Sequence, residues 1–222
     1  MELKKFYRNV EEIIISDVIT YLRKNNMTQK FEILNIDISE SITNENVDII
    51  KNNNVTTVKI NPNNFINKSD EYHNLFNGNK FNIVNCRFTL KYFTKTINTM
   101  SKFIAFISDV LEKDGVMFGY LFDLNNINAK FLKNSVISSG KNKIEYNGDD
   151  IDDEFIKLTI NDENIKIIKS HEFENICNNF NLFLQDRIIL KNIHKNSLNH
   201  IKLNKNEQKL GFLNYIFIMR KI

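Results

Sequence analysis

The sequence predicts an α/β fold built on a mostly parallel sheet. Two observations support this: short apolar or β-branched segments alternate with amphipathic helical segments, and the last two strand segments are separated by only about 21 residues. Strands that alternate with helices form crossover units with parallel neighbours, whereas the short final connection favours an antiparallel closing pair. The 222 residues are enough for one domain with a packed core.

The composition is that of a globular protein. Hydrophobic residues make up 42% of the chain and include 18 Phe, which argues against intrinsic disorder. The formal charge of +3 is too weak to indicate nucleic-acid binding by itself. The apolar runs are far shorter than the roughly 20 residues of a membrane-spanning helix. Two cysteines are too few for a disulfide framework or a zinc cluster, so we expect a reducing compartment, no membrane and no metal.

The first half of the chain alternates between strand and helix patterns. Apolar spacings of three and four predict helices over Phe6–Leu22 and Asn98–Leu111, and a further helix is expected over Ile42–Ile50. Apolar and β-branched segments predict strands over Phe31–Ile36, Val55–Ile60, Phe81–Cys86 and Val116–Phe122. Lys113-Asp114-Gly115 is a helix stop ahead of the last of these strands.

The second half is richer in strand patterns. Strands are expected over Lys143–Tyr146, Phe155–Ile160 and Ile165–Ile168, a helix over Glu172–Asn178, and closing strands over Leu182–Leu190 and Phe212–Met219. The chain shows no repeat and no linker. We therefore expect a single domain with a helical segment 1–27, a nucleotide-binding-type half 28–130 and a C-terminal half 131–222.

One segment is distinctive. Residues 80–93 read Lys-Phe-Asn-Ile-Val-Asn-Cys-Arg-Phe-Thr-Leu-Lys-Tyr-Phe. This resembles the strand and turn F-D/N-I-V/I-x-x-Q-F-x-x-H-Y of messenger-RNA cap guanine-N7 methyltransferases, most closely the poxvirus and large DNA virus type. Residues 114–120 resemble the G-G-x-x-x-G-T strand of that family, and Glu163–Phe180 and Leu203–Lys221 resemble its later parts.

The resemblance implies a Rossmann-like class I methyltransferase fold, with a mostly parallel seven-stranded sheet and an antiparallel C-terminal strand pair. It also implies S-adenosylmethionine as methyl donor, bound across the carboxyl ends of the first strands. The residues implied at the donor are Asp37, Ser39, Ser41, Asn61, Arg87 and Phe88. Those implied around the cap guanine are Tyr92, Lys91, Asp123 and Glu163. No catalytic residue is assigned, because methylation of the neutral N7 needs no protein base.

Several implied site positions depart from the family pattern. Its glycine-x-glycine loop falls on residues 39–41, where Glu40 brings a negative charge towards the carboxylate of the donor. Two unit charges near 4 Å repel by roughly 1 to 4 kcal/mol. Asn61 replaces the aspartate that clamps the ribose, and Arg87 and Lys91 replace Gln and His. These losses favour a degenerate, non-catalytic member of the family, retained for binding or assembly.

Other interpretations stay open. One is an active enzyme with an unorthodox loop, the only case in which S-adenosylmethionine is expected; another is an unrelated α/β interaction protein. Tyr92 and Phe88 are also typical core aromatics, and Glu163 is a typical hairpin carboxylate. The stretch Lys191–Lys209 is either a long polar loop or a contact to RNA phosphates.

The resemblance also implies partners and a location. The partners are capped RNA and a protein of a capping or transcription complex. The location is cytoplasmic, in a viral factory or a virion if the protein is viral. The sequence does not tell a free subunit from a piece of a larger capping enzyme.

Overall fold

The computed structural model describes residues 2–25, 30–38, 48–52, 54–67, 72, 74–94, 96–123, 136–139, 142–151, 155–160 and 163–222. The chain divides into two compact units that interleave along the sequence. The first unit comprises Met1–Met27, Leu121–Lys169 and Arg187–Ile216, and the second comprises Thr28–Tyr120, Ser170–Asp186 and Phe217–Ile222. The division expected at residues 27 and 130 stays a prediction.

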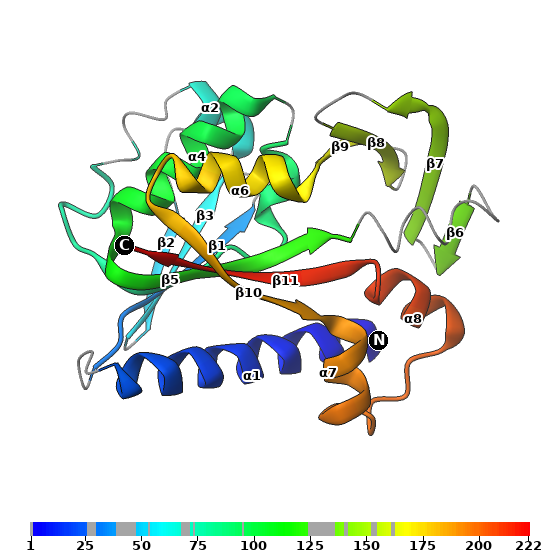
Figure 1. The fold of residues 1–222 in the computed structure, drawn as a ribbon, viewed down its shortest axis with the longest axis horizontal. Helices are drawn as coiled ribbons and strands as arrows, with labels where there is room; N and C mark the ends of the chain where they lie inside the picture. Colours follow the sequence, from blue (N-terminus) through cyan, green and yellow to red (C-terminus); the bar gives the residue numbers. More distant parts are fainter. Residues whose placement is uncertain are drawn as a thin grey trace. The chain divides into compact units, whose positions relative to one another are not determined.

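The strands form two sheets, one of seven strands in the order β10-β11-β5-β4-β1-β3-β2 and one of four in the order β6-β7-β8-β9 (Figure 1). The strands are β1 (Ile33–Ile38), β2 (Asp48–Asn52), β3 (Val55–Ile60), β4 (Phe81–Asn85), β5 (Leu111–Phe122), β6 (Val136–Ser139), β7 (Asn142–Ile151), β8 (Phe155–Ile160), β9 (Glu163–Ile168), β10 (Leu182–Ile189) and β11 (Asn214–Lys221). The helices are α1 (Glu2–Lys24), α2 (Pro62–Asn67), the 3₁₀ helix η1 (Thr89–Tyr92), α4 (Ile97–Val110), α6 (Ser170–Asn178), α7 (Leu190–Asn196) and α8 (Lys205–Gly211).

The centre of the larger sheet is parallel. Strand β1 pairs with β3 on one side and with β4 on the other, and β4 pairs with β5, all in the parallel sense. The carboxyl ends of these strands therefore meet at one edge of the sheet. Helices α4 and α6, both in the second unit, lie side by side (Figure 1).

The closing strand β11 is antiparallel to β5 and to β10. The backbone N–H of Asp123 donates to the carbonyl of Leu213 at 2.6 Å, so the end of β5 lies beside the start of β11. The N–H of Ile222 donates to the carbonyl of Asn181 at 3.0 Å, which joins the end of β11 to the start of β10. This mostly parallel sheet with an antiparallel C-terminal strand is the expected Rossmann-like class I methyltransferase fold.

The first edge of this sheet differs from the expectation. The prediction of a helix over Ile42–Ile50 is wrong for residues 48–50, the part of this range that the structure describes, because Asp48–Asn52 forms β2. Strand β2 pairs with β3 in the antiparallel sense, and Asn52 lies opposite Val55. A nine-residue apolar pattern does not separate a helix from a strand, and the hairpin pairing with β3 decides between them. The first half of the sheet is therefore not wholly parallel.

The smaller sheet belongs to the first unit. Its strands β6 to β9 are joined in sequence and pair in the antiparallel sense. The strands expected over Lys143–Tyr146, Phe155–Ile160 and Ile165–Ile168 are confirmed as parts of β7, β8 and β9. That they form a sheet of their own with β6 was not predicted from the sequence.

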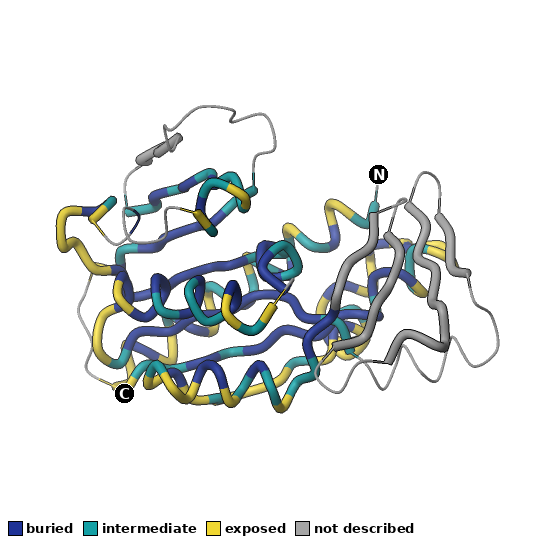
Figure 2. Tube along the Cα trace, turned by 90° about the horizontal axis from the view of Figure 1, so that it is seen from above, coloured by how far each residue is buried: buried dark blue, intermediate teal, exposed yellow. Residues whose placement is uncertain are grey.

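The core of the second unit is an aromatic cluster around Phe65. This side chain is buried and its ring lies 5.3 Å from that of Phe93, 5.6 Å from Phe103 and 5.5 Å from Phe106. Each such side chain, once buried, stabilises the fold by roughly 1.5 to 3 kcal/mol. Figure 2 shows how the buried residues follow the central strands. Because Phe65 is on α2, the cluster also fixes the turn between β3 and α2.

The core of the first unit is built on α1. The predicted helix over Phe6–Leu22 is confirmed and extends from Glu2 to Lys24. Its buried residues recur at helical spacing, namely Phe6, Val10, Ile14, Val18 and Leu22. No helix in the described part of the chain is long and apolar enough to cross a membrane.

Candidate functional site

Two asparagines occupy paired positions on the neighbouring strands β1 and β4. Asn35 of β1 pairs in register with Asn85 of β4, and both side chains are buried. The Nδ2 group of Asn85 donates to Oδ1 of Asn35 at 3.1 Å. Asp37 follows Asn35 by two positions within β1, and Arg87 follows Asn85 by two positions in the turn after β4.

Asp37 and Arg87 form an ion pair across this edge. Nη1 of Arg87 lies 2.7 Å from Oδ1 and 2.8 Å from Oδ2 of Asp37. The side chain of Arg87 is 35% exposed and that of Asp37 is 30% exposed, so water partly screens the pair. The sequence implied both residues at the donor site but did not predict that they bind each other. Opposite charges two positions after Asn35 and Asn85, which pair in register, are the signal that could have revealed the pair.

The backbone of Arg87 is held in a left-handed turn. Its φ is 45°, and its N–H donates to Oδ1 of Asn85 at 3.0 Å. Its carbonyl accepts the N–H of Tyr120 at 2.9 Å, which joins the turn to β5. At Gly119 a Cβ atom would lie 3.1 Å from that carbonyl. The close approach of β5 therefore favours glycine at position 119, within the strand that resembles the family motif.

Asn61 is the N-cap of α2. Its Oδ1 accepts the N–H groups of Asn63 at 2.9 Å and Asn64 at 3.3 Å, and its carbonyl accepts the N–H of Phe65 at 2.9 Å. Pro62 occupies the first helical position, where its missing N–H costs nothing. The side-chain oxygen expected to hold a ribose hydroxyl is thus engaged by the helix.

Aromatic side chains lie at the same end of β4. The ring of Phe88 stacks on that of Tyr120 with a centroid distance of 4.3 Å and an angle of 9° between the planes. Phe88 is half-buried and Tyr120 is buried. Nζ of Lys91 lies 4.7 Å from the centre of the Tyr92 ring, within cation–π range. The structure therefore places the implied cap residues Lys91 and Tyr92 on η1, close to Arg87 in the chain.

The remaining implied residues lie elsewhere or outside the described part of the chain. Asp123 follows β5 and Glu163 begins β9, opposite Ile160, so both belong to the first unit. The hairpin position of Glu163 is the one expected for a turn carboxylate. Ser39 and Ser41 lie outside the described residues, as does Glu40 between them.

The described residues do not fit the donor site that the resemblance implies. Arg87 is engaged by Asp37, and Asn61 is neutral and caps a helix. In the described turn from Ile60 to Asn64 no carboxylate is present to accept two ribose hydroxyls.

Other kinds of chemistry are not supported by the described residues. Burial raises the pKa of the thiol of Cys86, which precedes Arg87, and this keeps the thiol protonated and unsuited as a nucleophile. Among the described residues, no group of three His, Cys, Asp or Glu side chains could hold a metal ion.

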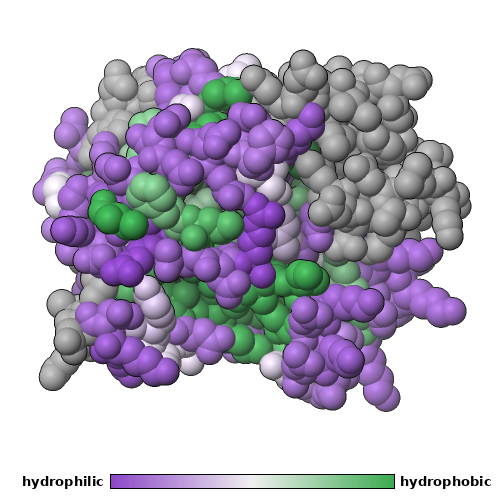
Figure 3. Space-filling model, viewed as in Figure 1, coloured by the Kyte–Doolittle hydropathy of each residue, from purple (hydrophilic) through white to green (hydrophobic). Residues whose placement is uncertain are grey.

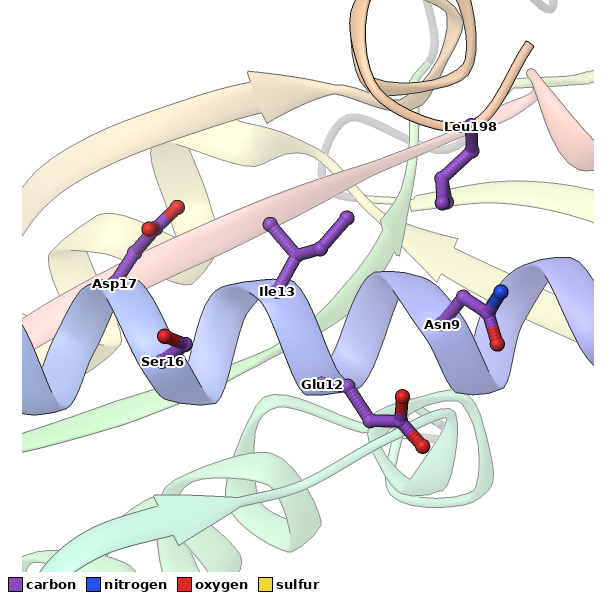
Figure 4. Close-up of a pocket in the computed structure, with 6 residues that line it drawn as sticks. All are labelled: Asn9, Glu12, Ile13, Ser16, Asp17 and Leu198. Atoms are coloured by element: carbon purple, nitrogen blue, oxygen red, sulfur yellow. The ribbon is translucent and has the colours of Figure 1, made fainter. Parts of the chain in front are cut away.

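The first unit carries a surface hollow along α1 (Figure 4). Its volume is about 380 Å³, and it is lined by Asn9, Glu12, Ile13, Ser16, Asp17 and Leu198. In Figure 4, Ile13 and Leu198 approach each other, whereas Glu12 and Asp17 leave the helix in different directions. Two carboxylates, those of Glu12 and Asp17, line this hollow, so it is acidic and unsuited to an anionic ligand.

Comparison with known proteins assigns this chain to no family. No family model matches the chain, and no curated protein matches it. A S-adenosylmethionine-dependent methyltransferase from Clostridium acetobutylicum is 13% identical, with a TM-score of 0.49 over 98% of each chain. A methyltransferase from Methanosarcina mazei is 11% identical, with a TM-score of 0.49 over 90% of this chain and 97% of the other. An amino pentose methyltransferase from Micromonospora echinaspora, solved with S-adenosylmethionine, is 9% identical, with a TM-score of 0.49 over 96% of this chain and 90% of the other.

The chain has a methyltransferase-like fold. The identities and TM-scores of these solved structures are too low to establish this fold. The assignment of the fold rests on the strand order and strand directions described above. Substrate and activity are not carried over from these proteins.

Proposed function

We propose that this chain is an mRNA cap guanine-N7 methyltransferase-like protein with a degenerate donor site. In this proposal it is a non-catalytic subunit or binding module of an RNA capping machinery. The observation that carries the proposal is the ion pair between Asp37 and Arg87 at the carboxyl ends of β1 and β4.

The ion pair opposes donor binding for an electrostatic reason. A class I fold holds its ligand at the carboxyl ends of the central strands, where these two side chains neutralise each other. A zwitterionic donor would have to displace one charge from the other, and at the end of β3 it would meet Asn61, which is already engaged as a helix cap. Because N7 methylation relies on positioning and electrostatics, weak donor binding removes most of the catalysis.

Residues on and beside η1 support retained recognition of the cap. Tyr92 provides an aromatic face and Lys91 provides a positive charge, which together suit a nucleobase that carries phosphates. We include Asp123 and Glu163 in the proposal as acceptors for the edge of the guanine. The partners proposed are capped RNA and a protein of the capping or transcription complex.

Two measurements test the two halves of this proposal. Titration calorimetry with S-adenosylmethionine and S-adenosylhomocysteine is expected to give no heat of binding at millimolar ligand, and micromolar binding would overturn the degenerate donor site. Retention on an immobilised cap analogue is expected for the wild type and is expected to fall for Tyr92→Ala. The control is Tyr21→Ala, an exposed tyrosine of α1, which should not change retention. Equal loss for both variants, or no retention at all, would overturn the cap assignment.

A further inference from the structure

The first unit presents a basic surface that the proposed function does not use. It consists of residues 2–8 at the start of α1 and residues 190–211, which include α7 and α8. These two stretches hold eight Lys or Arg residues and two Glu, a net charge of +6, whereas the whole chain has a net charge of +3. The rest of the chain is therefore acidic on balance, and positive charge is concentrated here.

Packing brings the two stretches together, although about 190 residues separate them in the chain. The ring of Phe6 lies 5.6 Å from that of His194 and 6.2 Å from that of Phe212. The hydroxyl of Tyr7 donates to the carbonyl of Gly211 at 3.3 Å. The start of α1 is therefore fixed against α7 and α8 within one unit.

The positive side chains of this basic surface point to solvent. The exposed ones are Lys4, Lys5, Arg8, Lys191, Lys195, Lys202, Lys205 and Lys209. Glu207 is held by the capping box of α8, where its Oε2 accepts the N–H of Asn204 at 3.0 Å. Figure 3 shows hydrophilic residues over α7 and α8. Eight positive charges therefore outnumber Glu2 and Glu207 on the basic surface itself. The acidic hollow of Glu12 and Asp17 adjoins this surface at Leu198, so an anion is expected to bind away from that edge.

We propose that the basic surface binds the sugar-phosphate backbone of RNA. Lysines at several points of one surface match a chain of phosphates, each of which gives up counterions on contact. Exposed asparagines lie between the lysines and can bond to sugars and bases; they are Asn192, Asn196, Asn199 and Asn206. The choice of RNA among polyanions rests on the proposed function.

An anionic membrane suits this surface less well than RNA. A helix that lies on a membrane inserts an exposed apolar face between the lipids. Here the apolar side chains of residues 190–211 are turned inward, namely Leu190, Ile193, Leu198, Ile201, Leu203 and Leu210. Ile189, directly before this stretch, is 43% exposed, but one apolar side chain is not the continuous apolar face that insertion needs.

The test compares two matched double variants. In Lys191→Glu/Lys202→Glu both substitutions lie on the basic surface, and neither adds a negative charge at a helix C-terminus. In the control, Lys30→Glu/Lys113→Glu, two exposed lysines outside the surface carry the same charge change, and neither is at a helix C-terminus. Affinity for an uncapped single-stranded RNA is measured by fluorescence anisotropy over a range of salt concentrations. Circular dichroism establishes that both variants are folded.

The first variant is expected to lose about ten-fold or more in RNA affinity, and its salt dependence should become shallower by about 1.4 in log–log slope, for two lost phosphate contacts. The control should stay within about two-fold of the wild type. Equal affinity in the first variant and the wild type overturns the proposal. Binding of phosphatidylserine vesicles that matches RNA binding, and that is lost in the same variant, also overturns it in favour of a membrane.

The same experiment separates this inference from the proposed function. Uncapped RNA contains no cap guanine, so failure of the cap-analogue experiment leaves binding by the basic surface standing. Conversely, cap retention that persists in Lys191→Glu/Lys202→Glu, together with unaltered RNA affinity, overturns only the inference about the basic surface.

Discussion

The side chain and the backbone of Arg87 are both held by residues far away in the sequence. Its guanidinium binds Asp37, which lies 50 residues earlier, and its carbonyl is held by β5. A double-mutant cycle with Asp37→Asn and Arg87→Gln is expected to give a coupling free energy of about 1 kcal/mol, because the pair is partly exposed. Urea denaturation of the four proteins measures it. A coupling near zero would mean that the pair contributes nothing to stability.

Asn61 gives a prediction that separates a helix cap from a ligand. Asn61→Ala removes the acceptor of two backbone N–H groups and is expected to lower the free energy of unfolding by about 1 kcal/mol. Asn61→Asp keeps the acceptor and should retain the stability of the wild type. Denaturant midpoints of the two variants measure the difference. Equal stability of the two would contradict the capping role.

The two cysteines should be inert in the folded protein. Burial raises the pKa of both Cys86 and Cys177, so little thiolate forms at neutral or mildly alkaline pH. Iodoacetamide at about pH 8 is expected to modify neither cysteine until urea unfolds the chain, as measured by mass spectrometry. Rapid alkylation without urea would show that the thiols are accessible and the core is open.

At the scale of elements, the turn at the end of β4 and strand β5 depend on each other. A Cβ at position 119 would lie 3.1 Å from the carbonyl of Arg87, from Cβ of Cys86 and from Cε1 of Phe217. Gly119→Ala is therefore expected to cost about 1 to 3 kcal/mol of stability. The control is Gly78→Ala, where φ is +78° but nothing lies within 4 Å, so the cost is about 1 kcal/mol. Thermal unfolding compares them, and a smaller effect at position 119 would contradict the packing argument.

The elements were predicted where the local pattern is strong. The helices over Phe6–Leu22 and Asn98–Leu111 and the closing strands are confirmed within a few residues at each end. The sequence predicts a polar loop over Lys191–Lys209, yet most of α7 and most of α8 lie within it. These helices are seven residues each, too short for periodicity to show, and they are held by packing against α1.

At the scale of the whole molecule, a ligand that binds only the folded state raises the unfolding temperature. S-adenosylmethionine at 100 times its dissociation constant would add about 2.7 kcal/mol. For a degenerate donor site we expect no shift in the thermal midpoint at millimolar S-adenosylmethionine, while a cap analogue raises it. Differential scanning calorimetry measures both. A shift with the donor alone would favour the active enzyme.

The sequence by itself determined the alternation of strands and helices and the residues that follow each strand. These features depend on side-chain spacing and turn residues within about ten positions, which can be identified without a fold. Only the tertiary structure decided that Asp37 binds Arg87, that Asn61 caps α2, and that the start of α1 joins α7 and α8 in one basic surface. The first and last of these depend on partners 50 to 204 residues apart, whose meeting is set by strand register and core packing rather than by local pattern.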